Sequence, residues 1–150
     1  MIDLHTHSFL SDGVLLPEEL VRRCEEQGYR FLVISDHVGI SNVAAVVPQL
    51  VRLCRSLRGK GRVKVLPGAE ITHVRPELIK RAVSLAQKAG AAVVLGHGET
   101  IVEPVLPGTN RALIEAGLDV LAHPGLISEA DARLAARKGV CLEISARQGR

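Results

Sequence analysis

The sequence predicts an α/β protein in which parallel strands form a barrel that helices cover on its outer side. First, short apolar runs alternate with helical segments along the 150 residues, and this alternation implies right-handed crossovers and a parallel sheet. Second, the apolar runs end in polar residues of metal-binding type. The carboxyl ends of strands meet at one rim in a barrel, whereas a doubly wound open sheet spreads them along a line. A shared site therefore favours the barrel.

Six apolar runs are expected as strands. The run from Phe31 to Ile34 is continuously apolar, which is typical of a strand buried on both faces. On the first strand Asp3, His5 and His7 share one face, because side chains alternate along a strand. In chain order the predicted strands are residues 2–5, 31–34, 63–66 with its continuation to Glu70, 91–95, 118–121 and 140–144.

Five helices are expected between these strands. The first opens with Pro17 and two acidic residues and ends at Gly28, as the helix dipole and the glycine C-cap favour. The second is predicted from Pro48 to Leu57, because proline is tolerated in a first turn and not in a helix interior. The others are residues 76–89 before Gly90, a short helix capped by Thr109 and closed at Gly117, and a helix capped by Ser128 and closed at Gly139.

Length and composition indicate one domain. Hydrophobic residues make up 47% and charged residues 23% of the chain, which is ordinary for a globular domain. No apolar run has membrane-spanning length, and Asp3 and His5 so close to Met1 argue against a signal peptide. The three cysteines are odd in number and irregularly spaced, which is typical of thiols in a reducing compartment. We therefore expect a cytoplasmic protein without a membrane partner.

The charge pattern argues against nucleic acid as a partner. The net charge is +3, and many of the cations lie between Arg52 and Lys64. Their helical spacing favours a solvated face over a nucleic-acid patch. Only Phe9, Tyr29 and Phe31 are aromatic, so the chain offers no platform on which bases could stack.

The polar residues at the strand ends predict a metal centre. Five of the six histidines take part, and carboxylates that can bridge favour two or three divalent ions over a single zinc. Such ions lower the pKa of a shared water, so that a metal-bound hydroxide can attack an electrophile. Phosphate esters suit this chemistry, since the cations stabilise the charged oxygens of the transition state. The candidate ligands are His5, His7, Asp12, His37, Glu70, His97 and His123.

Six short motifs follow one another in the chain: Asp3-Leu4-His5-Thr6-His7-Ser8, Ser11-Asp12-Gly13, Ser35-Asp36-His37, Gly68-Ala69-Glu70, Gly96-His97-Gly98-Glu99 and Leu121-Ala122-His123-Pro124. Together they resemble the PHP (polymerase and histidinol phosphatase) domain family. The resemblance implies a distorted TIM-like (β/α)7 barrel, phosphoesterase activity and up to three ions of zinc, manganese or iron.

The resemblance also implies a role for each ligand. His5 and His7 would hold a first ion, and Glu70 would bridge. His97 and His123 would hold the second ion and form the catalytic centre together with Glu70. Asp12 and His37 would hold the third ion.

One motif of the family is not found at its expected place, after the sixth predicted strand. Family members close the barrel with a seventh strand that ends in Asp-x-His, and no such motif follows the sixth predicted strand within residues 1–150. We expect one PHP-type domain of about six strands, with the first and sixth strands as open edges. The alternatives expected for the missing strand are that the chain is a fragment, that another subunit of a homo-oligomer fills the gap, or that solvent ligands do.

Four further residues are candidates for substrate binding. His73 lies on the loop after Glu70, and Glu99 follows His97 closely, although support of the ligands is an alternative role for Glu99. Arg147 and Arg150 could clamp a phosphate with their guanidinium groups. Asp3 and Asp36 each lie close to a ligand histidine and are expected to position it.

The predicted function is metal-dependent hydrolysis of a small phosphomonoester, with histidinol phosphate as the first guess by family analogy. A nucleotide or nucleic-acid phosphodiesterase is the alternative enzyme. The alternative outside the enzymes is an inactive metal-binding module.

Overall fold

The fold is a curled parallel sheet with helices on its outer side, seen in a computed structural model that describes residues 1–145. The strands run in the order β1-β2-β4-β5-β6-β7, and the short β3 pairs with β4. All the pairs are parallel. Their bounds are Ile2–Thr6 (β1), Phe31–Ile34 (β2), His37–Val38 (β3), Lys64–Ile71 (β4), Val93–His97 (β5), Val120–Ala122 (β6) and Cys141–Leu142 (β7).

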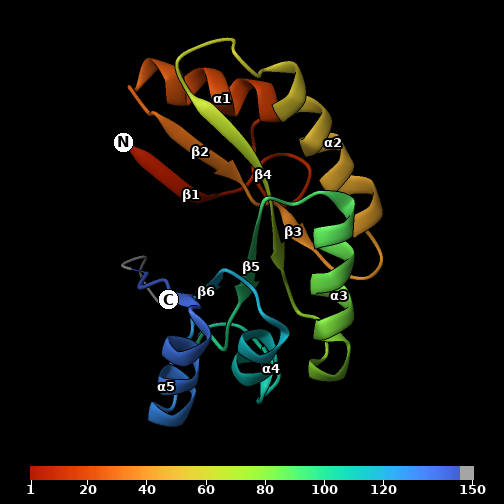
Figure 1. Cartoon of the computed structure of the whole chain (residues 1–150), viewed down its shortest axis with the longest axis vertical. Helices are drawn as coiled ribbons and strands as arrows, with labels where there is room; N and C mark the ends of the chain where they lie inside the picture. Colours follow the sequence, from red (N-terminus) through yellow and green to blue (C-terminus); the bar gives the residue numbers. More distant parts are fainter. Residues whose placement is uncertain (146–150) are drawn as a thin grey trace.

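Five helices connect these strands among the described residues. They are α1 (Pro17–Glu26), α2 (Val43–Ser56), α3 (Pro76–Ala89), α4 (Thr109–Ala116) and α5 (Glu129–Lys138). Figure 1 shows the sheet curling through half a barrel, with the helices on its convex side and the concave side open. The predicted distorted TIM-like α/β fold is confirmed in this half-barrel form.

Four of the helices lie where the sequence predicts them, and α2 does not. The predicted cap of α4 is wrong, because Gly108 is the N-cap and Thr109 is the first helical residue. Helix α2 begins at Val43, so Pro48 lies inside the helix and not in its first turn. A proline inside a helix removes one hydrogen bond and costs about 3 kcal/mol. Burial of Val43, Val46, Val47 and Leu50 against the sheet offsets that cost.

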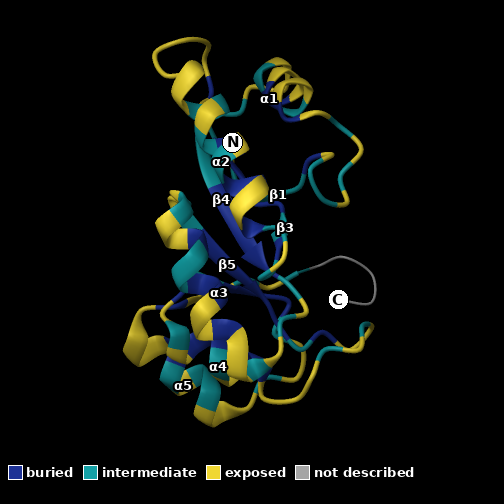
Figure 2. Ribbon diagram, turned by 90° about the vertical axis from the view of Figure 1, so that its right-hand side faces the viewer, coloured by how far each residue is buried: buried dark blue, intermediate teal, exposed yellow. Residues whose placement is uncertain are grey.

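The core fills the space between the sheet and the helices. Leu32, Val33 and Ile34 of β2 are fully buried, and Figure 2 shows the central strands buried beneath half-exposed helices. Leu113 and Ile114 of α4 are also fully buried. The apolar runs of the central strands therefore pack in the core, and the polar residues that follow these runs are available to form a site.

The half-barrel has two edges. Within residues 1–145, β1 pairs only with β2 and β7 only with β6. Ile2 and Leu4 on the β1 edge are 64% and 48% exposed. Strands β1 and β7 correspond to the first and sixth predicted strands, which are expected from the sequence to be the open edges. No described helix combines the length and apolar character needed to cross a membrane.

Candidate metal centre

Residues at or near the carboxyl ends of the strands bring their side chains together in one cluster. His5 comes from β1, and His7 lies in the loop that follows. His37 begins β3, Glu70 lies near the end of β4 and His97 ends β5. His123 follows β6 with a left-handed backbone (φ 48°), and Glu143 follows β7. All seven predicted ligands lie in this cluster, each in at least one group with its neighbours.

Glu70 is the centre of the cluster and is fully buried. Its Oε2 atom lies 2.9 Å from Nδ1 of His37, 3.1 Å from Nε2 of His7 and 3.2 Å from Nε2 of His5. None of these contacts has the geometry of a hydrogen bond, so both Glu70 carboxylate oxygens and His7 Nε2 are buried without a hydrogen-bond partner. Buried polar atoms are rarely left unpaired, and these atoms face one another across a small space.

This arrangement fits divalent cations. Four groups of three side chains have ligand atoms within 4.8 Å of one another. Imidazole nitrogens and carboxylate oxygens are the donors that zinc, manganese and iron accept. The groups are His5, His7 and Glu70; His7, Asp12 and His37; Glu70, His97 and His123; and His5, His123 and Glu143.

The burial and the charges of the cluster shift the pKa values of its side chains. Burial would lower the pKa of His5, but Glu143 and Glu70 outweigh it and raise that pKa to about 10. Burial would raise the pKa of Glu70, but contacts with His37, His5 and His7 hold it well below its usual range. Burial lowers the pKa of His97 and of His123. Glu70 is therefore anionic and His97 and His123 are neutral near pH 7, which are the states that bind cations.

Asp36 fixes the loop that carries His7 and Asp12. This carboxylate is fully buried. It accepts hydrogen bonds from the backbone N–H of Ser8 at 2.7 Å, the Ser8 hydroxyl at 2.6 Å and the Ser11 hydroxyl at 2.6 Å. On β1, the Asp3 carboxylate accepts a bond from the His5 N–H at 3.1 Å. Both aspartates contact the backbone beside a candidate ligand, and neither belongs to a group that could hold a metal ion.

Glu99 lies beside the cluster and binds the start of α4. Its carboxylate accepts a bond from the Asn110 N–H, and its own N–H donates to Oδ1 of Asn110, both at 2.9 Å. The Asn110 amide also donates to the carbonyl of Pro124 at 2.8 Å. Asn110 thereby joins the loop after His97 to the loop after His123.

His73 lies at the rim of the cluster and is 41% exposed in its side chain. Its Nε2 atom is 3.2 Å from Oε2 of Glu103, and that oxygen is 3.4 Å from Nε2 of His97. His73 has a left-handed backbone with φ 50°. Arg147 and Arg150, the predicted phosphate clamps, lie outside the described residues.

Two acidic residues of the site are missing from the sequence-based list. Glu143 is 2.6 Å from Nδ1 of His5, and Glu103 approaches both His73 and His97. A signal existed for Glu143, because it lies at the end of the sixth predicted strand. Glu103 lies in a loop without periodicity, and no sequence pattern indicates it.

Fold and site together define a class: α/β half-barrel proteins with a histidine and carboxylate centre at the carboxyl ends of their strands. A model of the PHP domain family matches residues 3–137. The chain therefore belongs to the PHP domain family, as its motifs indicate.

The chain is similar to curated proteins over different lengths. It is 38% identical over 149 residues to Uncharacterized protein MJ1295 of Methanocaldococcus jannaschii, which covers 98% of this chain and 68% of that protein. It is 39% identical over 72 residues to the 5'-3' exoribonuclease Rnm of Escherichia coli, covering 48% of this chain and 22% of that enzyme. A 5'-3' exoribonuclease of Haemophilus influenzae is 51% identical over 41 residues, 27% of this chain and 15% of that enzyme. The chain thus spans about two thirds of the archaeal protein and under a quarter of either exoribonuclease.

Proposed function

We propose that this chain is a metal-dependent phosphoesterase whose cluster around Glu70 binds two or three divalent cations. One observation carries the proposal: three imidazole nitrogens surround one buried carboxylate oxygen without forming hydrogen bonds to it. Within this set, both Glu70 carboxylate oxygens and His7 Nε2 are buried without a hydrogen-bond partner, and such atoms are suited to coordinating a metal ion. Zinc, manganese and iron all suit this mixed donor set.

The side chains of the site have distinct proposed roles. Bound divalent ions would supply an activated water and polarise the phosphate oxygens. Glu70 contributes a buried negative charge that several ligands share, and His97 and His123 contribute neutral nitrogens in one group with it. His73 is exposed at the rim, where it can donate a hydrogen bond to a substrate oxygen. Glu99 supports the loop after His97 through Asn110, and contact with substrate stays a further proposal for it.

The first proposed substrate is a small phosphomonoester, with histidinol phosphate as the family analogue to assay. A second candidate has specific support: two relatives that align with part of the chain are named 5'-3' exoribonucleases. Cleavage of an RNA phosphodiester is therefore proposed as the alternative. A cytoplasmic location is also proposed, since Cys24, Cys54 and Cys141 are free thiols.

The test is a comparison of substrates with manganese-loaded and zinc-loaded protein. We expect hydrolysis of histidinol phosphate or of a 5'-phosphorylated oligoribonucleotide, and the faster substrate decides between the two candidates. The variant His97→Ala should lose at least about a hundredfold in rate. Gln49→Ala, on the exposed side of α2, should retain full activity.

Two results would contradict the proposal. Tight metal binding without turnover of either substrate would identify an inactive metal-binding module. Equal activity of His97→Ala and Gln49→Ala would show that the cluster is not the active site.

A further inference from the structure

A second cavity lies at the other end of β4 from the metal centre. Its volume is about 550 Å³, within the range of small-molecule sites. It is bounded by the end of α2, the loop between α2 and β4, the first half of β4 and the turn before β5. Of the cavity residues on β4, Pro67 is nearest to Glu70 along the strand and lies three residues before it, so about 10 Å separates this edge of the cavity from the cluster.

The cavity exists because β4 is longer than its neighbour. Strand β2 pairs with β4 from Lys64 to Pro67, whereas β5 pairs with it only from Gly68 onward. The edge of the first half of β4 is therefore left open on the β5 side. Pro67 ends this open segment: its carbonyl accepts a hydrogen bond from the Ala92 N–H at 2.7 Å, and it has no N–H to donate to an added strand. The edge is therefore better suited to a small ligand than to another β-strand.

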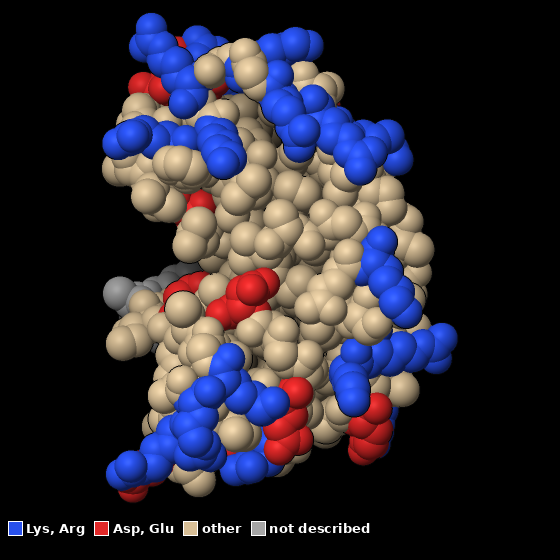
Figure 3. All heavy atoms as spheres, viewed as in Figure 1, with Lys and Arg blue, Asp and Glu red and all other residues tan. Residues whose placement is uncertain are grey.

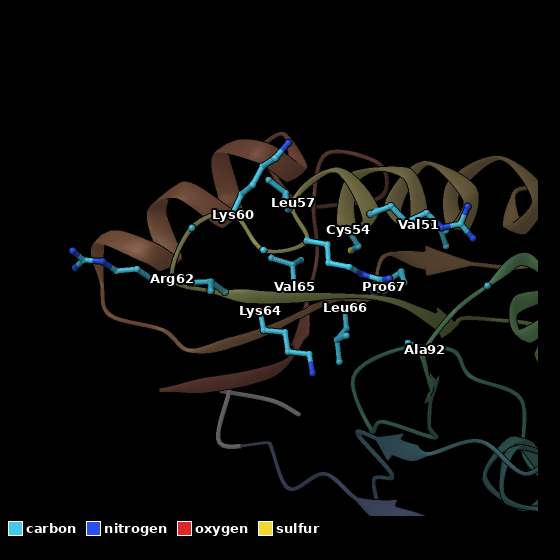
Figure 4. Close-up of a pocket in the computed structure, with 16 residues that line it drawn as sticks. Val51, Cys54, Leu57, Lys60, Arg62, Lys64, Val65, Leu66, Pro67 and Ala92 are labelled. Carbon is cyan, nitrogen blue, oxygen red and sulfur yellow. The ribbon is translucent and has the colours of Figure 1, made fainter.

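The rim of the cavity is strongly cationic. Among residues 1–145, five Lys or Arg residues line it and no acidic residue does. Figure 3 shows Lys and Arg side chains gathered over this end of the molecule, and Figure 4 shows Lys60 and Lys64 on opposite sides of β4. The cations are Arg55, Arg58, Lys60, Arg62 and Lys64.

The acid nearest to the rim is already engaged. Oε1 of Glu25 accepts a hydrogen bond from the backbone N–H of Arg62 at 3.0 Å, and Oε2 lies 3.6 Å from a guanidinium nitrogen of Arg22. Glu25 therefore holds the loop before β4 in place and leaves the cationic side chains of the rim without an acidic partner in the cavity. On β4, Lys64 is held with Nζ 5.7 Å from the centre of the Phe31 ring.

The walls of the cavity are apolar. Val51, Leu57, Val65, Leu66, Pro67 and Ala92 line it, and Figure 4 shows Cys54 between α2 and β4. Burial raises the pKa of the Cys54 thiol to about 11, so this side chain is neutral and adds to the apolar wall. An apolar chamber with a cationic rim is complementary to an apolar group that carries phosphates.

We propose that this cavity binds a small organic diphosphate of nucleotide size, with its phosphates on the cationic rim and its apolar part between α2 and β4. The site is separate from the metal centre. The basic segment from Arg52 to Lys64 then has a function besides solvation. The limited volume and the absence of aromatic side chains from the lining favour a small ligand over a strand of RNA.

The test measures binding to the metal-loaded protein by calorimetry. The probes are ADP and geranyl diphosphate, which present the same phosphates on a nucleoside and on an aliphatic chain. We expect saturable binding of at least one probe, and the tighter probe identifies the source of the apolar part. Pyrophosphate alone should bind at least about tenfold more weakly, because it leaves the apolar wall empty.

Two variants locate the binding. Arg58→Ala combined with Lys60→Ala removes two rim charges, and Ala92→Phe fills the cavity. Each should weaken binding by about tenfold or more. The matched controls on α5, Arg137→Ala with Lys138→Ala and Ala136→Phe, change exposed residues elsewhere and should bind as the wild type does. Binding does not require turnover, so this result is independent of the phosphoesterase assay.

Three results would overturn the proposal. The first is the absence of binding of either probe. The second is unchanged binding in the rim and Ala92→Phe variants, which would place the bound probe at the metal centre. The third is binding of a single-stranded oligoribonucleotide through the rim with displacement of both probes, which would make the surface an RNA contact and not a small-molecule site.

Discussion

The carboxylate of Glu143 lies 2.6 Å from Nδ1 of His5, although 138 residues separate the two in the chain. The contact joins the two open edges of the half-barrel, β1 and β7, at the metal centre. His5, His123 and Glu143 also form one of the groups that could hold an ion. Glu143 thus supplies a second carboxylate beside His5, in addition to Glu70, and the ligands predicted from the sequence do not include it.

Replacement of Glu143 by Gln should weaken metal binding at the His5 side of the cluster. Glutamine keeps the shape of the side chain and removes the negative charge, so we expect affinity for the most weakly held ion to fall by about tenfold or more. Metal titration followed by elemental analysis measures this affinity and the metal content of the protein. Glu129→Gln, an exposed change on α5, is the control. Equal metal content and affinity in both variants would show that Glu143 is not part of the centre.

The same pair predicts how the metal-free protein responds to pH. The folded-state pKa of His5, about 10, lies above its ordinary value of 6.5. The stabilisation that protonated His5 gains from its contact with Glu143 is therefore complete below pH 6.5 and is lost as the pH rises through about 10. We expect the stability difference between wild type and Glu143→Gln to shrink across this window. Urea unfolding of chelator-treated protein measures it, and a difference that stays constant would contradict the assignment.

Chelation should remove the ions in a defined order. Glu70, His97 and His123 are all buried, whereas His7 and Asp12 are 18% and 62% exposed in their side chains. We expect the ion at the buried group to be retained longest, and complete removal to lower the melting temperature, because ligand binding stabilises the folded state. Stepwise chelation of His7→Ala and His97→Ala, with metal analysis at each step, separates the groups. Retention of the tightest ion by His97→Ala and its loss from His7→Ala would reverse this order.

Asn110 should matter for stability more than an exposed amide does. It is 4% exposed and bonds to Glu99 and to the Pro124 carbonyl. Asn110→Ala leaves the Glu99 N–H and the Pro124 carbonyl unpaired, at about 1–3 kcal/mol for each buried group. Urea unfolding should show this loss, while Gln49→Ala should stay within about 0.5 kcal/mol of wild type. Comparable stability of the two variants would rule out Asn110 as a structural link.

Much of the fold follows from local signals in the sequence. The helix at residues 76–89 has proline at its start and Gly90 at its end, and it is found with those bounds. The start of α2 could not be predicted, because it depends on tertiary burial that outweighs the local penalty at Pro48. The strand β3 has only two residues and exists through its pairing with Glu70 and Ile71. A strand of that length has no period of its own to detect.

Site residues at the ends of strands could be predicted from the sequence, whereas site residues that loops bring into place could not. His5, Glu70 and His97 follow apolar runs, so the rule that parallel strands converge places them together. Glu103 comes close to His73 and His97 through the path of the loop after β5, which no local pattern encodes. The capping of α4 by Glu99 likewise depends on Asn110 being brought alongside.

Asp36 should control metal retention without binding metal itself. Its carboxylate is fully buried and accepts three hydrogen bonds from Ser8 and Ser11, which fixes the loop carrying His7 and Asp12. Asp36→Ala removes these bonds, each worth about 1.5–3 kcal/mol when the acceptor is charged. We expect a lower melting temperature and selective loss of the ion bound by His7, Asp12 and His37, with the ion at Glu70, His97 and His123 retained.

The matched control for Asp36→Ala is Asp119→Ala. The Asp119 carboxylate accepts a bond from the Val94 N–H at 2.8 Å, at the opposite end of the sheet from the metal centre. This variant should lose stability and keep its full metal content, because the bond it breaks lies far from the ligands. If the two variants lost the same amount of stability and kept the same metal content, Asp36 would contribute to the stability of the fold and would not position His7 and Asp12.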